Sequence, residues 1–186
     1  MAARGIPEHV AYEHGLGVVR DPLPGHERQE GWLVIPYLSP GGVLDLKYRC
    51  MEDHDHQAAG HPKYIGETGS TAKLYGVNAF REDSPVLGIT EGELDAVVAT
   101  SVVGLPSIGI SGANKWCSWW SHCFEGYEEV IVLQDGDEAG EKLSKTVGAN
   151  LYNCNVRIVP MWTGEDVSSS VLTRGIEAVR ERIGLA

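Results

Sequence analysis

Residues 130–140 read Val-Ile-Val-Leu-Gln-Asp-Gly-Asp-Glu-Ala-Gly, and this stretch decides the fold. The four apolar residues at 130–133 are typical of a short strand that is buried on both faces. The glycine and acidic residues that follow predict a sharp turn into a helix, which we expect over residues 138–152. A buried strand that leads directly into a helix is the repeating unit of a parallel α/β sheet.

The same pattern extends outward along the chain in both directions. Residues 86–90, Val-Leu-Gly-Ile-Thr, precede a helical pattern over 93–103, and residues 108–110 precede another over 115–124. A strand over 156–160 and an amphipathic helix over 175–183 follow. Strands that alternate with helices predict an α/β domain with a four-stranded parallel sheet flanked by helices. We place this domain at residues 85–186.

Residues 1–84 follow a different pattern. A short helix is expected over 7–14, and two strand-like runs at 32–36 and 43–49 are separated by Ser-Pro-Gly-Gly at 39–42, which predicts a hairpin turn. Residues 50–62 are rich in Asp, His and Gly and are expected to form an exposed loop, with a further extended piece over 63–65. We therefore expect a small mixed α+β subdomain ahead of the α/β domain.

The composition favours an intracellular protein without membrane contact. No apolar run approaches the roughly 20 residues needed to cross a bilayer, and the N-terminus lacks the apolar stretch of a secretory signal. The expected location is the cytoplasm. Free thiols are the preferred interpretation of the cysteines over disulfides, because their spacing is unpaired. The cysteines are Cys50, Cys117, Cys123 and Cys154.

Acidic residues follow two of the predicted strands. Glu91 comes after the strand at 86–90, and Asp135 and Asp137 come after the strand at 130–133. The carboxyl ends of parallel strands meet at one edge of a sheet, where ligands bind. Carboxylates brought together there repel one another unless a hard divalent cation lies between them. The alternative for Asp135 or Asp137 is to cap the following helix.

Further residues extend this predicted metal site. Asp95 and Asp166 are expected to be outer members of the acidic cluster, with Mg²⁺ as the cofactor and Mn²⁺ as a possible substitute. Gly92 and Gly136 allow sharp turns between strand and helix and close approach of the backbone to a ligand.

The basic residues are few. The formal net charge is −11, whereas affinity for nucleic acid comes largely from Lys and Arg side chains that neutralise phosphates. We nevertheless expect Lys47, Arg49, Lys63 and Lys73 to form a local basic track if the fold places them on one face. The alternative for each is an ordinary solvated side chain. If the chain binds a template, we expect a partner to hold it there.

The segment at residues 110–116, Ile-Ser-Gly-Ala-Asn-Lys-Trp, has two equal interpretations. Backbone amides at a helix start, together with Lys115, suit a phosphate or a nucleotide. The alternative is a plain turn that Asn114 caps. For Trp116, Trp119 and Trp120 we prefer a core or partner-facing role over stacking on bases.

Two motifs in the second domain resemble the signature of a known family. Glu-Gly-x-x-Asp-Ala at 91–96 and Asp-Gly-Asp-x-Ala-Gly at 135–140 resemble the Toprim domain. That domain is shared by bacterial-type primases, type IA and II topoisomerases, and some nucleases and recombination proteins. The resemblance implies a Toprim fold in which Glu91, Asp135 and Asp137 coordinate Mg²⁺. It also implies a role for Glu91 as acid or base, as in some members.

The first subdomain resembles DnaG-type primases of bacteria and phages in particular. The resemblance lies in residues 35–49, in His-Pro-Lys-Tyr-Ile at 61–65 and in Lys-Leu-Tyr-Gly-Val at 73–77, although the last segment lacks two residues found in the family. It covers roughly residues 30–175. It implies a DNA primase catalytic core, a nucleotidyltransferase that makes short RNA primers on single-stranded DNA from ribonucleoside triphosphates. The basic residues, Lys115 included, would then contact template or nucleotide.

The chain also departs from that family. It has no N-terminal zinc module with paired Cys and His ligands, and the spacing Cys50-x₃-His54-x-His56-x₄-His61 is loose, so solvated loop histidines and no zinc are expected. There is no phosphate loop of a helicase motor. A separate zinc-binding primase module and a replicative helicase are therefore the expected partners.

Two rival functions use the same signature. A Toprim nuclease of repair or phage defence would have the same metal site and would nick DNA without ribonucleotides. A non-catalytic Toprim module that binds DNA and loads recombination proteins would bind neither Mg²⁺ nor nucleotide. The acidic residues alone do not distinguish these functions from primer synthesis.

Overall fold

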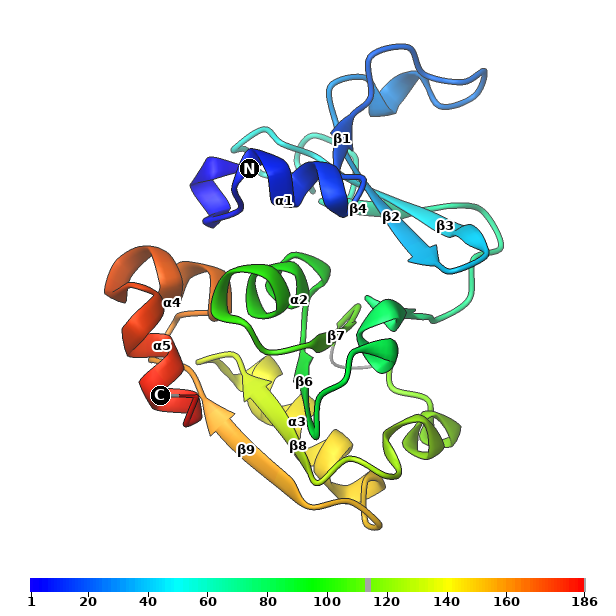
Figure 1. Cartoon of the computed structure of the whole chain (residues 1–186). Coiled ribbons are helices and arrows are strands. Elements are labelled where there is room, and N and C mark those ends of the chain that lie inside the picture. Colours follow the sequence, from blue (N-terminus) through cyan, green and yellow to red (C-terminus); the bar gives the residue numbers. More distant parts are fainter. Residues whose placement is uncertain (113–114, 186) are drawn as a thin grey trace. The chain divides into compact units, whose positions relative to one another are not determined.

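The computed structural model describes residues 1–112 and 115–185, and the chain divides into two compact units (Figure 1). One unit, here called the α/β unit, comprises Met1–Pro7 and Ala72–Ala186, and the other, the sheet unit, comprises Glu8–Thr71. Residues 72–84, expected from the sequence to belong to the first subdomain, thus pack with the α/β unit. The functional division of the chain at 84 stays a prediction.

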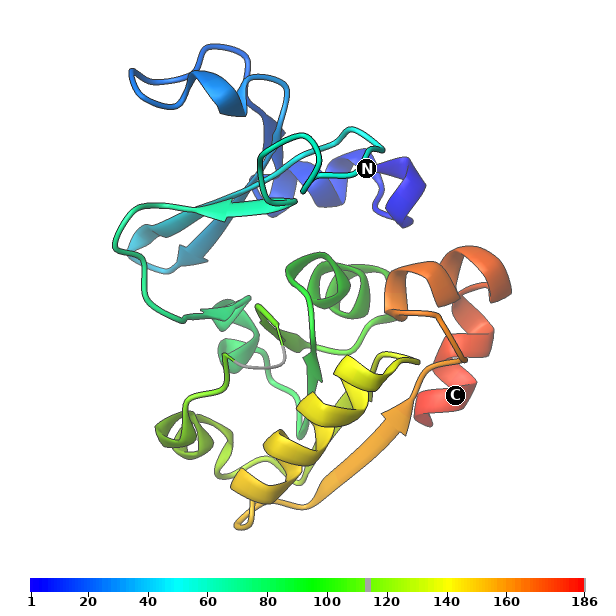
Figure 2. The same ribbon diagram turned by 180° about the vertical axis from the view of Figure 1, so that it is seen from behind.

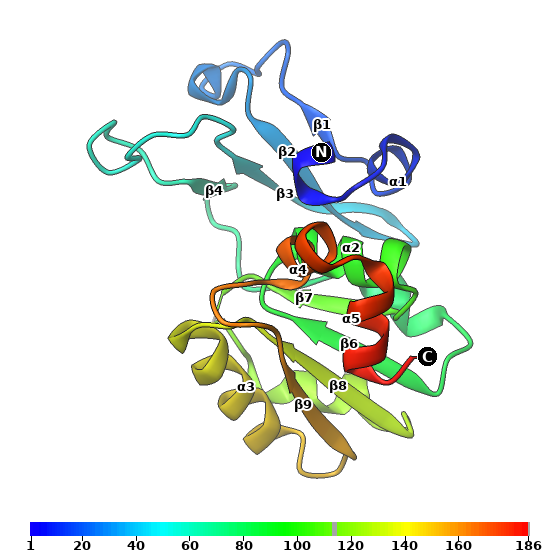
Figure 3. The same cartoon turned by 90° about the vertical axis from the view of Figure 1, so that its left-hand side faces the viewer.

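The α/β unit is built on a five-stranded sheet in the order β5-β7-β6-β8-β9 (Figure 3). Its strands are β5 (Leu74–Tyr75), β6 (Val86–Thr90), β7 (Ser107–Ile110), β8 (Glu129–Gln134) and β9 (Val156–Pro160). The pairs β6–β7, β6–β8 and β8–β9 are parallel, which confirms the predicted α/β class with its four parallel strands. The edge strand β5 is antiparallel to β7 and was not predicted, because two residues are too few to show a period.

Helices flank this sheet. They are α2 (Glu93–Val98), continued by a π-helical turn (Ala99–Val103), α3 (Glu138–Asn150), α4 (Val167–Arg174) and α5 (Ile176–Ile183). Figure 2 shows α3 lying across β8 and β9. The crossovers β6–α2–β7 and β8–α3–β9 run in opposite directions along the sheet, so right-handed connections place α2 and α3 on opposite faces.

Two parts of this unit differ from the expected helices. The segment expected to be helical over 115–124 forms a 3₁₀ helix, Ser118–Phe124. The helix α4 was not predicted. It begins with a capping box in which Asp166 and Ser169 satisfy each other's backbone amides, a pairing that fixes its first turn.

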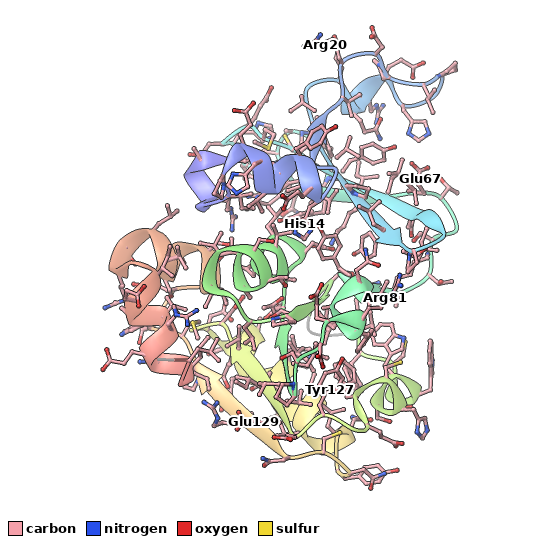
Figure 4. The ribbon with its side chains drawn as sticks, viewed as in Figure 1. His14, Arg20, Glu67, Arg81, Tyr127 and Glu129 are labelled. Carbon is pink, nitrogen blue, oxygen red and sulfur yellow. The ribbon has the colours of Figure 1, made fainter. Side chains whose placement is uncertain are left out.

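The core of the α/β unit lies on the buried strands, as their apolar runs predict. Leu87, Ile89, Val130 and Val132 pack with Phe124 from the 3₁₀ helix. Trp120 joins them at 3% exposure and Trp116 packs against the same cluster, which agrees with the preferred core role, whereas Trp119 is 64% exposed. At the amino end of β8, Glu129 (Figure 4) forms an ion pair with Arg157 of β9 at 2.8 Å.

The sheet unit contains four antiparallel strands in the order β1-β2-β3-β4. They are β1 (Gly17–Val18), β2 (Leu33–Ser39), β3 (Gly42–Arg49) and β4 (Tyr64–Gly66), and the short helix α1 (Glu8–Glu13) precedes them. The predicted hairpin is confirmed: Ser39 pairs with Gly42, whose φ of 118° favours glycine. Tyr48 of β3 donates a hydrogen bond to Glu67 (Figure 4) at 2.8 Å.

The remaining helical segments are short 3₁₀ helices at Ala2–Arg4, Glu27–Gln29 and Val77–Arg81. No helix in the described ranges is long and apolar enough to span a membrane. All four cysteines are free, as the sequence predicts.

Candidate functional site

The parallel pairing of β6 and β8 brings two acidic loops to one edge of the sheet. Ile89 lies beside Val132 in the register, so Glu91 and Asp135, which follow these strands, emerge at the same carboxyl edge. This is the edge at which ligands bind in open α/β sheets. Asp137, Asp95 and Asp166 lie near enough to act electrostatically on Asp135. We call these five side chains the carboxylate rim: Glu91, Asp95, Asp135, Asp137 and Asp166.

Asp135, like Asp95, is a member of the carboxylate rim whose pKa is raised. Burial raises the pKa of its carboxyl group to about 8, with further contributions from the charges of Asp95, Glu91, Asp166 and Asp137, in that order. Within the described part of the chain, its Oδ1 atom is buried and accepts no hydrogen bond. A buried acceptor among like charges is the environment that a bound cation stabilises. The residues therefore fit a hard divalent metal ion.

Asp137 has the structural role that the sequence left open. Its Oδ1 accepts a hydrogen bond from the amide of Gly140 at 2.8 Å and caps α3. Capping engages only one of the two carboxylate oxygens, so it is compatible with a role in metal binding. For Asp137, the two interpretations do not exclude each other.

Asp95 and Asp166 are held by partners of their own. Asp95, 6% exposed in α2, accepts hydrogen bonds through Oδ1 from the amide (2.9 Å) and hydroxyl (2.6 Å) of Ser168 in α4. Its burial, followed by the charge of Asp166, raises the pKa of Asp95. Asp166 caps α4 and forms an ion pair with Arg4 at 3.1 Å. These contacts join α2 to α4 and show structural roles that the sequence did not reveal.

The carboxylate rim is a loose arrangement. Among the side chains that the structure describes, no three of these carboxylates place oxygen atoms all within 4.8 Å of one another. Like charges at the edge of one sheet repel, and Asp95, Asp137 and Asp166 each have a hydrogen-bond partner of their own.

Two glycines of the signature are required by close packing of the backbone. A Cβ atom on Gly136 would lie 1.9 Å from the carbonyl oxygen of Trp162, and one on Gly140 would lie 2.4 Å from that of Asp135. Gly136 also exchanges hydrogen bonds with the loop after β9, through its amide to Glu165 and its carbonyl to Gly164. We expected Gly136 to permit approach to a ligand, but the group that approaches is this neighbouring loop, which fixes the turn that carries Asp135.

The predicted basic residues are divided between the units. Lys47 and Arg49 lie two residues apart on β3, and both lie over the ring of Tyr64, at 4.7 and 5.5 Å from its centroid. Lys63 immediately precedes β4, whereas Lys73 and Lys115 belong to the α/β unit. The structure therefore brings Lys47 and Arg49 together on one strand.

The anion-binding turn considered at residues 110–116 includes Ala113 and Asn114, which lie outside the described residues. Of that segment, Lys115 is exposed and Trp116 is half-buried.

The sequence interpretation set aside a third group, which the structure brings together in the sheet unit. Cys50, His54, His56 and His61 each offer one ligand atom, and these four atoms lie within 4.8 Å of one another. Cys50 is only 4% exposed and the three histidines are half-buried, so they are not the solvated loop side chains expected. The sequence signal was the clustering of Cys and His itself, which we discounted for its irregular spacing.

Comparison with known proteins gives both a relative and a fold. No protein-family model matches the chain. The Gene 57 protein of Mycobacterium phage D29 is 40% identical over 158 residues, which is 82% of this chain and 98% of that protein.

Three solved structures share the architecture at low sequence identity. The Aquifex aeolicus primase, with zinc-binding and RNA polymerase domains, has a TM-score of 0.79 at 20% identity, over 99% of this chain and 54% of that one. A DnaG primase catalytic domain bound to single-stranded DNA has a TM-score of 0.75 at 19% identity, over 100% of this chain and 72% of that one. The primase fragment of the bacteriophage T7 primase–helicase protein has a TM-score of 0.72 at 21% identity, over 98% of this chain and 73% of that one.

The likeness covers nearly all of this chain, which spans about half the length of the Aquifex structure. At such identities the likeness establishes the fold, and the phage relative establishes the family. The chain has the fold of DnaG-type primase catalytic cores and belongs to the family of the Gene 57 protein of Mycobacterium phage D29.

Proposed function

We propose that the chain is the catalytic core of a DNA primase that synthesises short RNA primers on single-stranded DNA. The observation that carries this proposal is the buried Oδ1 atom of Asp135 at the carboxyl edge of the sheet, on whose carboxyl pKa the charges of four other carboxylates act. Support comes from the fold, which is shared with primase RNA polymerase domains over nearly the whole chain. The reaction class is metal-dependent nucleotidyl transfer.

Within this proposal Glu91, Asp135 and Asp137 hold Mg²⁺, which Mn²⁺ can replace, and Asp95 and Asp166 shape the rim around it. When bound, the metal would neutralise the triphosphate of the incoming ribonucleotide and lower the pKa of the primer 3′-hydroxyl. The protein keeps Asp135 in a fixed position, because Gly136 lets the turn pack against the backbone of Trp162 and Gly140 lets α3 pack against the backbone of Asp135. Asp137 is positioned by its hydrogen bond to the start of α3.

The template and nucleotide would be held by the basic residues. Lys47 and Arg49, side by side over Tyr64, present two positive charges and an aromatic ring together on the sheet unit. Such a combination suits a single strand, whose phosphates need cations and whose bases stack on aromatic rings. Lys63, Lys73 and Lys115 are the further candidates for phosphate contacts.

Partner chains would help to hold this one on its template. A net charge of −11 disfavours tight template binding by the chain alone. The Aquifex and T7 structures belong to proteins that carry a zinc-binding domain and a helicase, respectively. We propose a separate zinc-binding primase module and a replicative helicase as partners.

The experiment is incubation with single-stranded DNA, labelled ribonucleotides and Mg²⁺ or Mn²⁺, with and without a candidate zinc-module protein. The wild-type chain should make short RNA, and a variant with both Asp135→Asn and Asp137→Asn should make none. Asp83→Asn, at an exposed carboxylate of the same unit, is the matched control and should be active. Normal synthesis by the double variant would overturn the proposal.

The same assay separates the rival functions. Nicking of plasmid DNA with metal but without ribonucleotides would indicate a nuclease. Binding of DNA without measurable affinity for Mg²⁺ or nucleotide would indicate a non-catalytic recombination module.

A further inference from the structure

The group at Cys50, His54, His56 and His61 lies where two paired strands leave the sheet. Cys50 directly follows β3, and its amide donates a hydrogen bond to the carbonyl of Lys63, the residue before β4, at 3.0 Å. The antiparallel pairing of Arg49 with Tyr64 therefore closes the connection over residues 50–63 at its base. That closure brings the first and last ligand-capable residues of the connection together.

The imidazole nitrogens of this group face inward at short distances. His54 Nε2 lies 3.1 Å from His61 Nε2 and 3.0 Å from His56 Nδ1. Nitrogen ligands on a tetrahedral zinc ion, each about 2.0–2.1 Å from the metal, are separated by roughly 3.3 Å. The observed spacing is thus close to that of a zinc coordination shell.

The outward nitrogens of two rings have acceptors that fix the tautomer. His54 Nδ1 lies 3.1 Å from a carboxylate oxygen of Glu52, and His61 Nδ1 lies 3.1 Å from the carbonyl oxygen of Pro62. In the tautomer that donates Nδ1–H to these acceptors, the Nε2 atom of each ring carries the lone pair. Two lone pairs then face each other between His54 and His61, an arrangement that a cation between them stabilises. Carboxylate and carbonyl partners of this kind accompany metal-binding histidines in general.

We propose that Cys50, His54, His56 and His61 bind one zinc ion in the sheet unit. One thiolate and three imidazoles form a tetrahedral set that suits zinc, whereas Mg²⁺ requires oxygen ligands. Four protein ligands complete the coordination of the ion, which makes the site structural. A pocket of about 490 Å³ lies beside the site and is lined in part by Cys50, Glu52 and His61.

The ion would fix the connection between β3 and β4. Two of the residues proposed to contact template adjoin this connection. Arg49 directly precedes Cys50, and Lys63 directly follows His61 and Pro62. The ring of Trp32 from the core of the sheet unit lies 5.1 Å from that of His61, so the site is attached to packed structure. The site shares no residue with the carboxylate rim, and the two sites can be tested separately.

The direct test is the zinc content of the full chain, purified without a histidine tag and measured by elemental mass spectrometry. We expect about one zinc ion per chain in the wild type, and loss of at least nine-tenths of it in His56→Ala and in Cys50→Ser. His122→Ala and Cys123→Ser, at exposed positions of the other unit, are the matched controls and should retain the metal.

Cobalt substitution distinguishes loss of a ligand from loss of the fold. The wild type should take up Co²⁺ and show a thiolate-to-cobalt absorption band, which Cys50→Ser should lack. Asp135→Asn should keep both the band and the zinc, so failure of primer synthesis and failure of this site give different results. A folded wild-type chain that contains no zinc and takes up no cobalt would overturn the proposal.

Glu52→Gln gives a graded test that leaves all four ligands in place. Weakening the acceptor for His54 Nδ1 should lower zinc affinity roughly 10–100-fold, measured by competition with a chromogenic chelator. Asp53→Asn, the exposed neighbour, should leave the affinity unchanged. Equal affinities for Glu52→Gln and the wild type would show that Glu52 does not support a metal ligand.

Discussion

The carboxylate rim of the α/β unit and the Cys–His group of the sheet unit assemble ligand-capable side chains in different ways. The rim arises from topology, since parallel strands end at one edge and deliver their acidic residues there. The Cys–His group arises from closure of a single connection between two antiparallel strands.

The two groups also differ in charge. Carboxylates repel one another, and three members of the rim are held by hydrogen bonds that serve helix caps and helix packing. The imidazoles of the Cys–His group lie close together instead, with His54 at 3.0 Å from His56 and at 3.1 Å from His61 between ring nitrogens. A loose rim of oxygen ligands suits an ion that is exchanged with substrate, whereas a compact set of one sulfur and three nitrogen ligands suits an ion that remains bound.

The largest effect should come from breaking the rim at Asp135, whose Oδ1 atom is buried and, among the described residues, accepts no hydrogen bond. Asp135→Asn should lower primer synthesis by about 10³-fold or more, because several kcal/mol of metal-dependent stabilisation of the transition state is lost. The rate of RNA synthesis at saturating nucleotide measures this loss. Zinc content should stay the same, and a variant that lost zinc as well would show that the two groups are coupled.

Gly136→Ala tests whether backbone packing holds the rim. The new Cβ would meet the carbonyl oxygen of Trp162, so the loop must move, at a cost of about 1–3 kcal/mol in the free energy of unfolding. Denaturant unfolding measures the change. Gly148→Ala in α3, whose Cβ would meet only a side-chain atom at 3.6 Å, should instead be neutral or stabilising, because Ala favours a helix.

The pH dependence of Mg²⁺ binding should distinguish the rim from an ordinary carboxylate site. Because the pKa of Asp135 is about 8 without metal, a proton must leave before the ion binds. Between pH 9 and pH 7 the apparent affinity should therefore fall about tenfold. Calorimetric titration at several pH values checks this, and Asp135→Asn should remove that part of the dependence.

Without metal, the free energy of unfolding should fall as the pH rises towards 8. A raised pKa in the folded state means that the unfolded chain loses the Asp135 proton more readily. This contribution to stability is therefore present below the ordinary carboxyl pKa of about 4 and is lost as the pH rises towards 8.

The smallest effect is expected at Asp166. Asp166→Ala removes the cap of α4 and the ion pair with Arg4, and should cost about 1 kcal/mol in the free energy of unfolding. Asp166→Asn keeps a capping side chain and should cost less. If Asp166→Ala instead removes primer synthesis while stability is preserved, then Asp166 acts mainly in metal binding and contributes little as a helix cap.

Much of the fold was predictable because its signals are local. The apolar runs at residues 86–90 and 130–133 identify buried strands, and the hairpin at 39–42 follows from its turn residues. Helix α4 escaped prediction because its amino end depends on a capping box between Asp166 and Ser169, within a stretch of serines that shows little apolar period.

The sequence by itself determined which acidic residues follow buried strands, and hence that Glu91 and Asp135 share an edge of the sheet. Only the tertiary structure decided that Asp95 is bound by Ser168, that Gly136 packs against Trp162 and that Cys50 meets His61. The physical reason is range: consecutive residues specify a strand or a turn, whereas each of these contacts depends on how separate elements pair or pack, whether across one strand connection, as for Cys50 and His61, or across much of the unit, as for Asp95 and Ser168.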